Sequence, residues 1–539
     1  MDILKIKDTG VEVKKLQNQL IALGFLCHEP TGYFGTLTNT AVKKAQKKFG
    51  AIENGEVSET FFHFLEDKVK ELTLWNMNEL QEILQGEWLV RADEPNVIVN
   101  ICNDNIKKVK GGSLFYSFDA TFYSDIIGNL GLVFKNGASV VLVTKVIKEK
   151  LNDSWSVLLV DDISKALNRL AKKSRKRLEG KVLCVTGSAG KTSTVSFLGQ
   201  ILSHFGLAYY NEENRNLLRM IAHCMVATPS NTEFAIYEVG AMPSAMVQAS
   251  KLIKPNVVVF TGTGKSHLSY MHSQLIVADI KSQLFFAIEP EGTVVLNRDD
   301  KFFKRVEEAA REFGVKNIVT FGEHLESNIR LVEFSIDARG TSVELIAFGE
   351  CLDFRIGLEG KHWVMNLLAV LGVTCSFGIQ ASEVIALFND ITPVARRGEK
   401  YQINLQNKDV TLYNDTFNAN PLSMNTAIEM LVNINSNNRK ILVLGQMEAL
   451  GDFSIAEHIA LANRIKKENI DKVFACGESM LHTYNNINES QKGGYANDSN
   501  LLADELIKNL LHKDIIVVKG SRSNKMENIL KRLKQEAAE

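Results

Sequence analysis

Apolar residues recur three or four positions apart in three short stretches near the N-terminus, as expected for amphipathic helices. These stretches cover residues 13–23, 38–45 and 61–65. Glycine-containing turns separate them. We therefore expect a three-helix module over residues 1–70. A module of this size buries little apolar surface and is marginally stable unless it docks on a neighbour.

Beyond this module the pattern changes to short apolar runs between helical stretches. Residues 74–178 contain strand candidates at 113–117 and 139–143 and a helix candidate at 164–170, which predicts a small α/β domain. From residue 179 the alternation becomes regular. Strand-like runs occur at 182–185, 234–239, 256–260, 293–296 and 317–321. This alternation is typical of a mostly parallel sheet covered on both faces.

A further set of strand-like runs follows Arg396-Arg397-Gly398, at 410–413, 440–444, 472–476 and 514–518. We interpret it as a separate, smaller α/β domain. The predicted fold class is therefore α/β, with the helical module followed by a small α/β domain at 74–178, a central parallel-sheet domain at 179–396 and a C-terminal Rossmann-like domain at 397–539.

Composition and charge exclude several classes of protein. The 539 residues carry 62 Lys plus Arg against 63 Asp plus Glu, and 45% are hydrophobic, which argues against disorder and against nucleic-acid binding. No apolar run is long enough for a membrane span, and no export signal opens the chain, so we expect a cytoplasmic location. Seven scattered cysteines without a CxxC pair favour neither a disulfide framework nor structural zinc. The basic run 172–177 is interpreted as a solvated linker.

The most specific chemical signal is a glycine loop between a strand and a helix. The apolar strand 182–186 is followed by Gly187-Ser188-Ala189-Gly190-Lys191-Thr192. Ser193 comes next, and apolar residues then recur with the spacing of a helix. Glycines let backbone N–H groups approach phosphate oxygens, and the helix N-terminus adds positive potential. Lys191 can neutralise a β- or γ-phosphate, and the Thr192 hydroxyl can bind Mg²⁺. We expect ATP to bind here.

The loop has two residues between Gly187 and Gly190, whereas the common phosphate loop has four between its glycines. This shorter form, which opens with Thr-Gly and closes with Gly-Lys-Thr, resembles that of the Mur ligases. These enzymes use ATP to join amino acids or peptides to the growing cell-wall stem. The resemblance extends over about residues 74–533. It implies that an acceptor carboxylate takes the γ-phosphoryl group to form an acyl phosphate, which an amine then attacks.

The resemblance also implies a set of metal ligands. Glu238 ends a predicted strand, at the sheet edge where parallel sheets place ligands, and a carboxylate there could hold a second Mg²⁺ ion. His267 matches the histidine of the family's Gly-rich segment, and Lys281 matches a lysine that the family carries as a carbamate. A carbamate would give Mg²⁺ an anionic oxygen ligand, but it needs a lysine of lowered pKa.

Further matches imply the rest of the nucleotide site. By resemblance, Asn297 and Asp300 contact the adenine end of ATP, His362 and Asn366 belong to a Gly-x-His-x-x-x-Asn pattern near the nucleotide, and Arg397 or the preceding Arg396 reaches the phosphates. The expected catalytic residues are Lys191, Glu238, His267, Lys281, Arg397 and Asp415.

The segment Asp415–Met424 distinguishes best between the branches of the family. It resembles the Asp-x-Tyr-Asn-Ala-Asn-Pro-x-Ser motif of the branch that adds D-alanyl-D-alanine, so Asn418, Asn420, Pro421 and Ser423 are expected to contact substrate. The segments 444–458 and 518–522 match the same branch. The implied mechanism requires the C-terminal domain to close on the phosphate loop.

The departures from the family concern the substrate. The segments 101–106 and 123–127 lack the arginine and the Asp-Gly-His that bind UDP, and Gln446 and Ala449 replace acidic residues on the amine side. Three hypotheses remain open. The chain is a D-alanyl-D-alanine-adding ligase, or the same chemistry acts on another carboxylate in a surface-glycan or natural-product pathway, or the chain is a non-catalytic ATP-binding scaffold.

The N-terminal module resembles the peptidoglycan-binding-like modules of cell-wall hydrolases. The match runs through spaced positions from Gly10 to Gly55, including Leu16-Gln17, Gly32 and Gln46. The resemblance implies a peptidoglycan precursor or a protein as partner for residues 1–70. A docking module that binds no glycan is the alternative.

Overall fold

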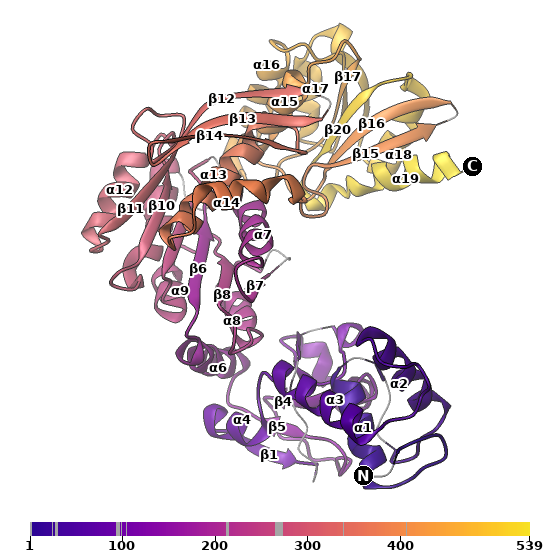
Figure 1. Ribbon diagram of the computed structural model, residues 1–539. Coiled ribbons are helices and arrows are strands. Elements are labelled where there is room, and N and C mark those ends of the chain that lie inside the picture. The colour runs from indigo at the N-terminus through magenta and orange to yellow at the C-terminus, as the bar shows by residue number, and fades with distance from the viewer. Residues whose placement is uncertain are drawn as a thin grey trace. The chain divides into compact units, whose positions relative to one another are not determined.

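The computed structural model describes residues 3–538 apart from 24, 27–30, 93–97, 99, 104, 212–214, 265–272, 338 and 406 (Figure 1). The chain forms two compact units. Unit 1 contains residues 1–179 and 219–232, and unit 2 contains residues 180–218 and 233–539. Unit 2 holds both the phosphate loop and the C-terminal domain.

Unit 1 begins with the three-helix module, whose turns are held by two buried glutamines. Its helices are α1 (Val11–Ala22), α2 (Thr36–Lys48) and α3 (Glu59–Leu72). Gln17 accepts a hydrogen bond from the Gly32 amide (2.8 Å) and donates one to Thr38 (2.9 Å). Gln46 accepts one from the Gly55 amide in the same way (2.9 Å). Each glutamine thus ties a helix to a turn whose glycine has positive φ.

The rest of unit 1 is a five-stranded sheet with helices, in the order β1-β5-β4-β3-β2. Strands β2 to β5 run parallel, and β1 pairs with β5 antiparallel. The elements are β1 (Glu87–Val90), β2 (Asn100–Asn103), β3 (Ser113–Tyr116), β4 (Ala138–Val143), β5 (Val157–Leu159), α4 (Met77–Leu84), α5 (Ile126–Lys135), α6 (Ile163–Arg177) and most of α8 (Leu218–Val226).

Two features of this unit differ from the sequence pattern. The basic run 172–177 is not a linker, because it forms the end of α6, where Arg177 lies over the Trp75 ring (3.9 Å) and donates to the Leu74 carbonyl (2.6 Å). Residues 219–232 group with unit 1, although they fall within the central range of the sequence. There Ser174 donates to the Met225 carbonyl (2.5 Å) and anchors α8 to α6.

The first sheet of unit 2 has nine strands, in the order β14-β13-β12-β11-β10-β9-β6-β8-β7. The strands are β6 (Lys181–Thr186), β7 (Ala208–Tyr210), β8 (Phe234–Glu238), β9 (Val257–Phe260), β10 (Thr293–Asn297), β11 (Asn317–Gly322), β12 (Ile329–Asp337), β13 (Gly340–Ala347) and β14 (Glu350–Ile356). All strands from β6 to β12 run parallel, and β12 to β14 form an antiparallel extension.

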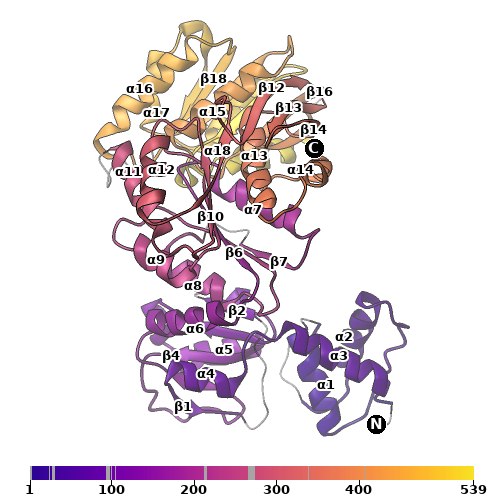
Figure 2. The ribbon, with the colours of Figure 1, turned by 60° about the vertical axis from the view of Figure 1, so that its left-hand side comes forward.

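Helices cover both faces of this sheet. They are α7 (Lys191–Leu202), α9 (Met246–Ile253), α11 (Gln274–Ser282), α12 (Phe303–Glu312), α13 (Lys361–Ser376) and α14 (Ala381–Ala386). Helices α7 and α13 pack on one face through Phe197, Leu198 and Trp363, while α9, α11 and α12 lie on the other (Figure 2). The apolar runs of the sequence follow from this arrangement, since each central strand is buried on both sides.

The second sheet of unit 2 has the order β15-β16-β20-β17-β18-β19, and only β15 runs antiparallel to its neighbour. Its strands are β15 (Glu399–Leu405), β16 (Lys408–Asp415), β17 (Lys440–Gly445), β18 (Lys472–Cys476), β19 (Lys492–Ala496) and β20 (Ile515–Lys519). Its helices are α15 (Pro421–Asn433), α16 (Ser454–Ile465), α17 (Met480–Asn486), α18 (Ser499–Asn509) and α19 (Glu527–Ala538).

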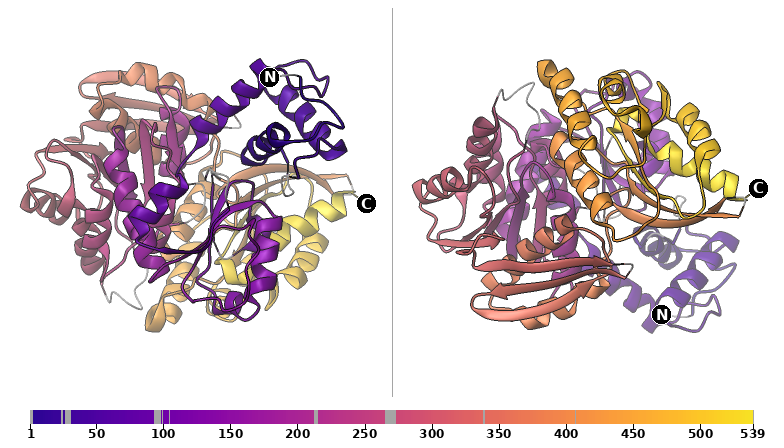
Figure 3. Two further views of the ribbon diagram at one scale, coloured as in Figure 1. Left: turned by 90° about the horizontal axis from the view of Figure 1, so that it is seen from below. Right: turned by 90° about the horizontal axis from the view of Figure 1, so that it is seen from above.

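The orange helices α15 and α16 lie on one side of the second sheet and the yellow helices α18 and α19 on the other (Figure 3). Alternate residues of β17 follow this division, because Leu442 and Leu444 belong to the first core and Ile441 and Val443 to the second. Among the described residues, no helix has the length and apolar character needed to cross a membrane.

Candidate functional site

The glycine loop joins the end of β6 to the start of α7 and is closely packed. Gly187 has φ +145° and Gly190 has φ +79°. A Cβ atom on Gly187 would lie 2.0 Å from the Thr261 hydroxyl, and one on Gly190 would lie 2.6 Å from Oδ1 of Asn366. Both positions therefore require glycine, for conformation and for space.

Two lysines converge on this loop. Lys191 donates to the Gly187 carbonyl at 3.0 Å, and Lys281, from the end of α11, donates to the same oxygen at 2.9 Å. The Lys281 side chain is almost completely buried. Burial, followed by the nearby charge of Lys191, lowers the pKa of Lys281 well below its usual value.

A carboxylate, a hydroxyl and a guanidinium form a chain beside the loop. Thr192 donates to Oε2 of Glu238 (2.5 Å), and Arg397 donates to the Thr192 hydroxyl (2.8 Å). The other carboxylate oxygen of Glu238, Oε1, accepts a hydrogen bond from the side-chain amide of Asn216 (2.8 Å). Glu238 is 2% exposed, so its charge depends on these partners.

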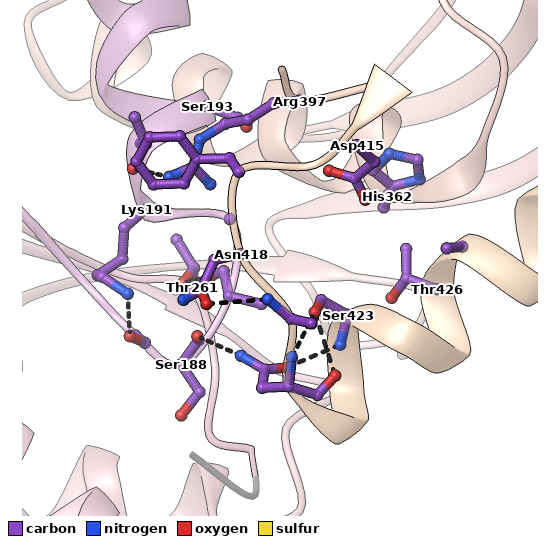
Figure 4. Close-up of a pocket in the computed structure, with 18 of the residues that line it drawn as sticks. Ser188, Lys191, Ser193, Thr261, His362, Arg397, Asp415, Asn418, Ser423 and Thr426 are labelled. Carbon is purple, nitrogen blue, oxygen red and sulfur yellow. Dashed lines mark hydrogen bonds between the residues drawn. The ribbon is translucent and has the colours of Figure 1, made fainter. Parts of the chain in front are cut away.

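The C-terminal domain reaches the loop through the N-terminus of α15. Asn420 caps this helix by accepting from the Ser423 amide (2.8 Å), and Ser423 accepts from the Asn420 amide (3.0 Å), with Pro421 at the first helical position. The Asn420 side chain also donates to the Ser188 carbonyl at 3.5 Å, which links the two domains (Figure 4).

Burial also shifts the pKa values of His362 and Arg397. Burial, followed by the charge of Lys519, lowers the pKa of His362 to about 3, so its imidazole is neutral. Burial also lowers the pKa of Arg397, whose guanidinium lies 4.1 Å from the centre of the Phe417 ring. Nε of Arg397 is a buried donor without a hydrogen-bond partner in the described part of the chain. Such a donor is suited to an anionic ligand.

These residues surround a cavity of about 500 Å³ inside unit 2. The predicted site residues that line it are Gly187, Ser188, Ala189, Gly190, Lys191, Thr192, Ser193, Glu238, Lys281, His362, Asn366, Arg397, Asp415, Asn418, Asn420 and Ser423. Figure 4 shows Asp415 and His362 on the same side of the cavity, and Lys191 near Ser188 on the opposite side.

Three predicted residues that the structure describes do not line this cavity. Asn297 donates to the Thr261 carbonyl (3.2 Å) and Asp300 accepts from the Thr263 hydroxyl (2.7 Å), so both brace the loop after β9 and do not line the cavity. Pro421 lines a neighbouring cavity. His267 lies outside the described residues.

Sequence reasoning assigned no site role to several residues that the structure places here. Asp299, next to the predicted Asp300, lines a second cavity of about 240 Å³ that shares His362 with the first. Lys519 lines the main cavity and contacts Asp415. Asn216 holds Glu238. The available signal for Lys519 was its place in segment 518–522, which matches the family, whereas nothing local indicated Asn216.

The residues fit a nucleotide polyphosphate and Mg²⁺. The loop offers backbone amides and a lysine, and Arg397 adds a guanidinium N–H that has no partner among the described residues; all of these are ligands for phosphate oxygens. Within the described part of the chain, His, Cys, Asp and Glu do not form a cluster of three or more. One carboxylate and one hydroxyl still suit Mg²⁺, which commonly binds through few protein ligands together with phosphates.

The fold and this cavity define a nucleotide-binding α/β protein in which a second domain approaches a short phosphate loop. Comparison with known families gives a more specific result. Residues 185–374 match the Mur ligase middle domain, residues 396–522 match the Mur ligase glutamate ligase domain, and residues 9–65 match a putative peptidoglycan binding domain. The chain belongs to the Mur ligase family. The predicted family and α/β fold class are confirmed, and with them the prediction of a ligase.

Individual relatives agree with this assignment. The UDP-N-acetylmuramoyl-tripeptide–D-alanyl-D-alanine ligase of Rickettsia prowazekii is 26% identical, over 80% of this chain and 94% of the relative. The Bacillus subtilis enzyme of the same name is 25% identical, over 85% and 98%. The crystal structure of MurF from Acinetobacter baumannii shares the fold with a TM-score of 0.74 at 23% identity, over 86% of this chain and 99% of that one.

Proposed function

We propose that this chain is an ATP-dependent ligase that joins D-alanyl-D-alanine to the terminal carboxylate of a UDP-muramoyl tripeptide in the cytoplasm. The convergence of the phosphate loop, Glu238, Lys281 and the Asp415–Ser423 segment on one cavity carries the proposal. The relatives named above add the substrate class.

We assign ATP to the short glycine loop. The loop amides and Lys191 hold the phosphates, and Arg397 supplies charge from the domain border. His362 and the second cavity beside it extend from the phosphate end toward the nucleoside. Asn366 packs against Gly190 and fixes the shape of the loop.

We assign Mg²⁺ to Thr192 and Glu238, with Lys281 as a carbamate and His267 as a further ligand by family resemblance. Burial lowers the pKa of Lys281, which favours the neutral amine, the form that can react with carbon dioxide. When bound, Mg²⁺ would stabilise the negative charge that develops on phosphate and acyl oxygens.

In the proposed reaction an acceptor carboxylate oxygen bonds to the γ-phosphorus as the bond to ADP breaks. The amine then attacks the carbonyl carbon of the acyl phosphate, loses a proton, and displaces inorganic phosphate to leave an amide. The Asn420–Ser188 contact indicates how the C-terminal domain closes the cavity and excludes water.

The direct test is ADP formation by the purified chain with ATP, UDP-muramoyl tripeptide and D-alanyl-D-alanine. The proposal predicts that ADP release requires both the acceptor and the amine. ADP release at the full rate when the acceptor or the amine is left out would contradict the proposal. Nucleotide binding without ADP formation from any acceptor would instead indicate a scaffold.

The same chemistry on another carboxylate is the second candidate, and unit 1 favours it. The Tyr123 hydroxyl accepts hydrogen bonds from Thr144 (3.1 Å), Asp125 caps α5, and Asn105 accepts from the Lys107 amide (3.0 Å). The segments that correspond to the family's UDP-binding segments thus use these side chains for internal hydrogen bonds. Asp104 lies outside the described residues. A panel of acceptor carboxylates with and without UDP separates the two candidates.

We further propose that residues 1–70 bring the chain to a peptidoglycan precursor. The family match at 9–65 supports this role. Removal of residues 1–70 is expected to raise KM for the acceptor and to leave KM for ATP unchanged. Equal constants for both proteins would contradict it.

A further inference from the structure

Lys519 ends the central strand β20 of the second sheet and is 2% exposed. Burying an ammonium group is costly unless partners compensate its charge. An apolar strand that ends in a buried lysine therefore indicates a specific use for that charge.

The partners of Lys519 are the last residue of the neighbouring strand β16 and the loop that follows this strand. Its Nζ donates to Oδ2 of Asp415 at 2.7 Å and to the Asn418 carbonyl at 2.9 Å. Asp415 and Lys519 are paired in the parallel register of β16 and β20, so the lysine bridges from one strand end to the loop of the next. One ammonium group thus holds the beginning of the loop and a point three residues further on.

This loop is the connection between the C-terminal sheet and the phosphate loop. It continues to Asn420, whose side chain contacts the Ser188 carbonyl. Asp415 and Asn418 both line the cavity, and Lys519 lines it as well.

We propose that Lys519 is a positioning residue that sets the conformation of the 415–420 loop and so the placement of Asp415 against the bound phosphates. The role rests on the proposed ligase function. The neutral state of His362 agrees with it, because the Lys519 charge is the second cause of the lowered pKa of that histidine.

The test compares Lys519→Met, which removes the charge, with Lys519→Arg, which keeps it. We expect Lys519→Met to lower kcat by about 100-fold or more while KM for ATP changes by less than about 3-fold, since the phosphate loop itself is untouched. Lys519→Arg should recover to within about 10-fold of the unaltered chain, because a guanidinium can still pair with Asp415. Lys508→Met, at an exposed lysine of α18, is the matched control.

Three results would overturn the proposal. The first is a Lys519→Met kcat within about 3-fold of the unaltered chain. The second is a Lys519→Arg variant as inactive as Lys519→Met. The third is failure of Lys519→Met and of Lys519→Gln to fold, since the lysine would then serve folding alone.

Hydrogen exchange tests the positioning role of Lys519 independently of the proposed ligase function, because the measurement needs no catalytic turnover. Amides 416–420 of the folded Lys519→Met variant should exchange at least about 10-fold faster than in the unaltered chain, with no change in α7. Unchanged exchange would refute the positioning role even if ligase activity is found. Faster exchange would support it even if the acceptor differs from the one proposed.

Discussion

Lys191 and Lys281 donate to one backbone oxygen, the Gly187 carbonyl, at 3.0 and 2.9 Å. They come from different helices, α7 and α11, and they share a single acceptor in a buried place. Two ammonium groups this close repel each other, and burial disfavours both charges. The pKa of each lysine is accordingly lowered by burial, and that of Lys281 is lowered further by the charge of Lys191.

The lowered pKa of Lys281 predicts dependence on carbon dioxide. A neutral amine reacts with carbon dioxide to give an anionic carbamate, which would also end the repulsion by Lys191. Removal of dissolved carbon dioxide should lower ligase activity by about 10-fold or more, and bicarbonate should restore it. The measurement is ADP formation in degassed and bicarbonate-supplied buffer.

Lys281→Ala is the matched variant for this experiment. We expect it to abolish amine-dependent phosphate release, as Lys191→Ala should, and to be insensitive to bicarbonate. Normal turnover by the Lys281→Ala variant would show that Lys281 has no role in the reaction.

Gly190→Ala should weaken nucleotide binding by about 10-fold or more, because the added Cβ would lie 2.6 Å from Oδ1 of Asn366 at φ +79°. Its free energy of unfolding should fall by about 1–3 kcal/mol. Gly314→Ala is the control, since Gly314 has φ +82° with nothing within 4 Å of a Cβ. Calorimetric titration with a non-hydrolysable ATP analogue should show a loss for Gly190→Ala alone.

Asn216→Ala should raise the Mg²⁺ concentration needed for half-maximal activity by about 10-fold, because Asn216 orients the Glu238 carboxylate. Asn231→Ala, at an exposed asparagine, should leave it unchanged. A normal Mg²⁺ requirement in Asn216→Ala would show that Glu238 is held without it, or that it binds no metal.

His362 predicts acid sensitivity of the fold. Its pKa is about 3 in the folded chain against 6.5 for an ordinary histidine, so below pH 6.5 the unfolded chain binds the extra proton. This contribution makes stability fall as pH drops from 6.5 toward 3, by up to about 1.4 kcal/mol per pH unit. Urea unfolding between pH 7 and pH 4 should be less pH-dependent in His362→Asn. Equal slopes for the two proteins would contradict the assignment.

Local sequence predicted the phosphate loop because its chemistry lies in consecutive residues. A strand, a glycine turn and a helix start are all local features, and Gly187 to Thr192 line the cavity together. The Asp415–Ser423 segment was recognisable for the same reason. Its Asn420–Ser423 capping box forms within four residues of chain.

Residues that act across the fold were not predictable in this way. Asp299 and Asp300 are adjacent, and only the direction of the turn after β10 decides that Asp300 contacts Thr263 while Asp299 faces the second cavity. Lys519 reaches the site because β20 lies beside β16, a sheet order that no sequence pattern specifies. Asn216 acts through Glu238, 22 residues away in the chain.

The transfer of an acceptor oxygen to phosphate tests the central claim most directly. UDP-muramoyl tripeptide labelled with heavy oxygen in its terminal carboxylate is incubated with ATP, D-alanyl-D-alanine and the chain, and the inorganic phosphate is analysed by mass spectrometry. The account predicts that each phosphate released with amide formation carries one labelled oxygen, and that Lys191→Ala releases none. Amide formation with unlabelled phosphate would contradict it.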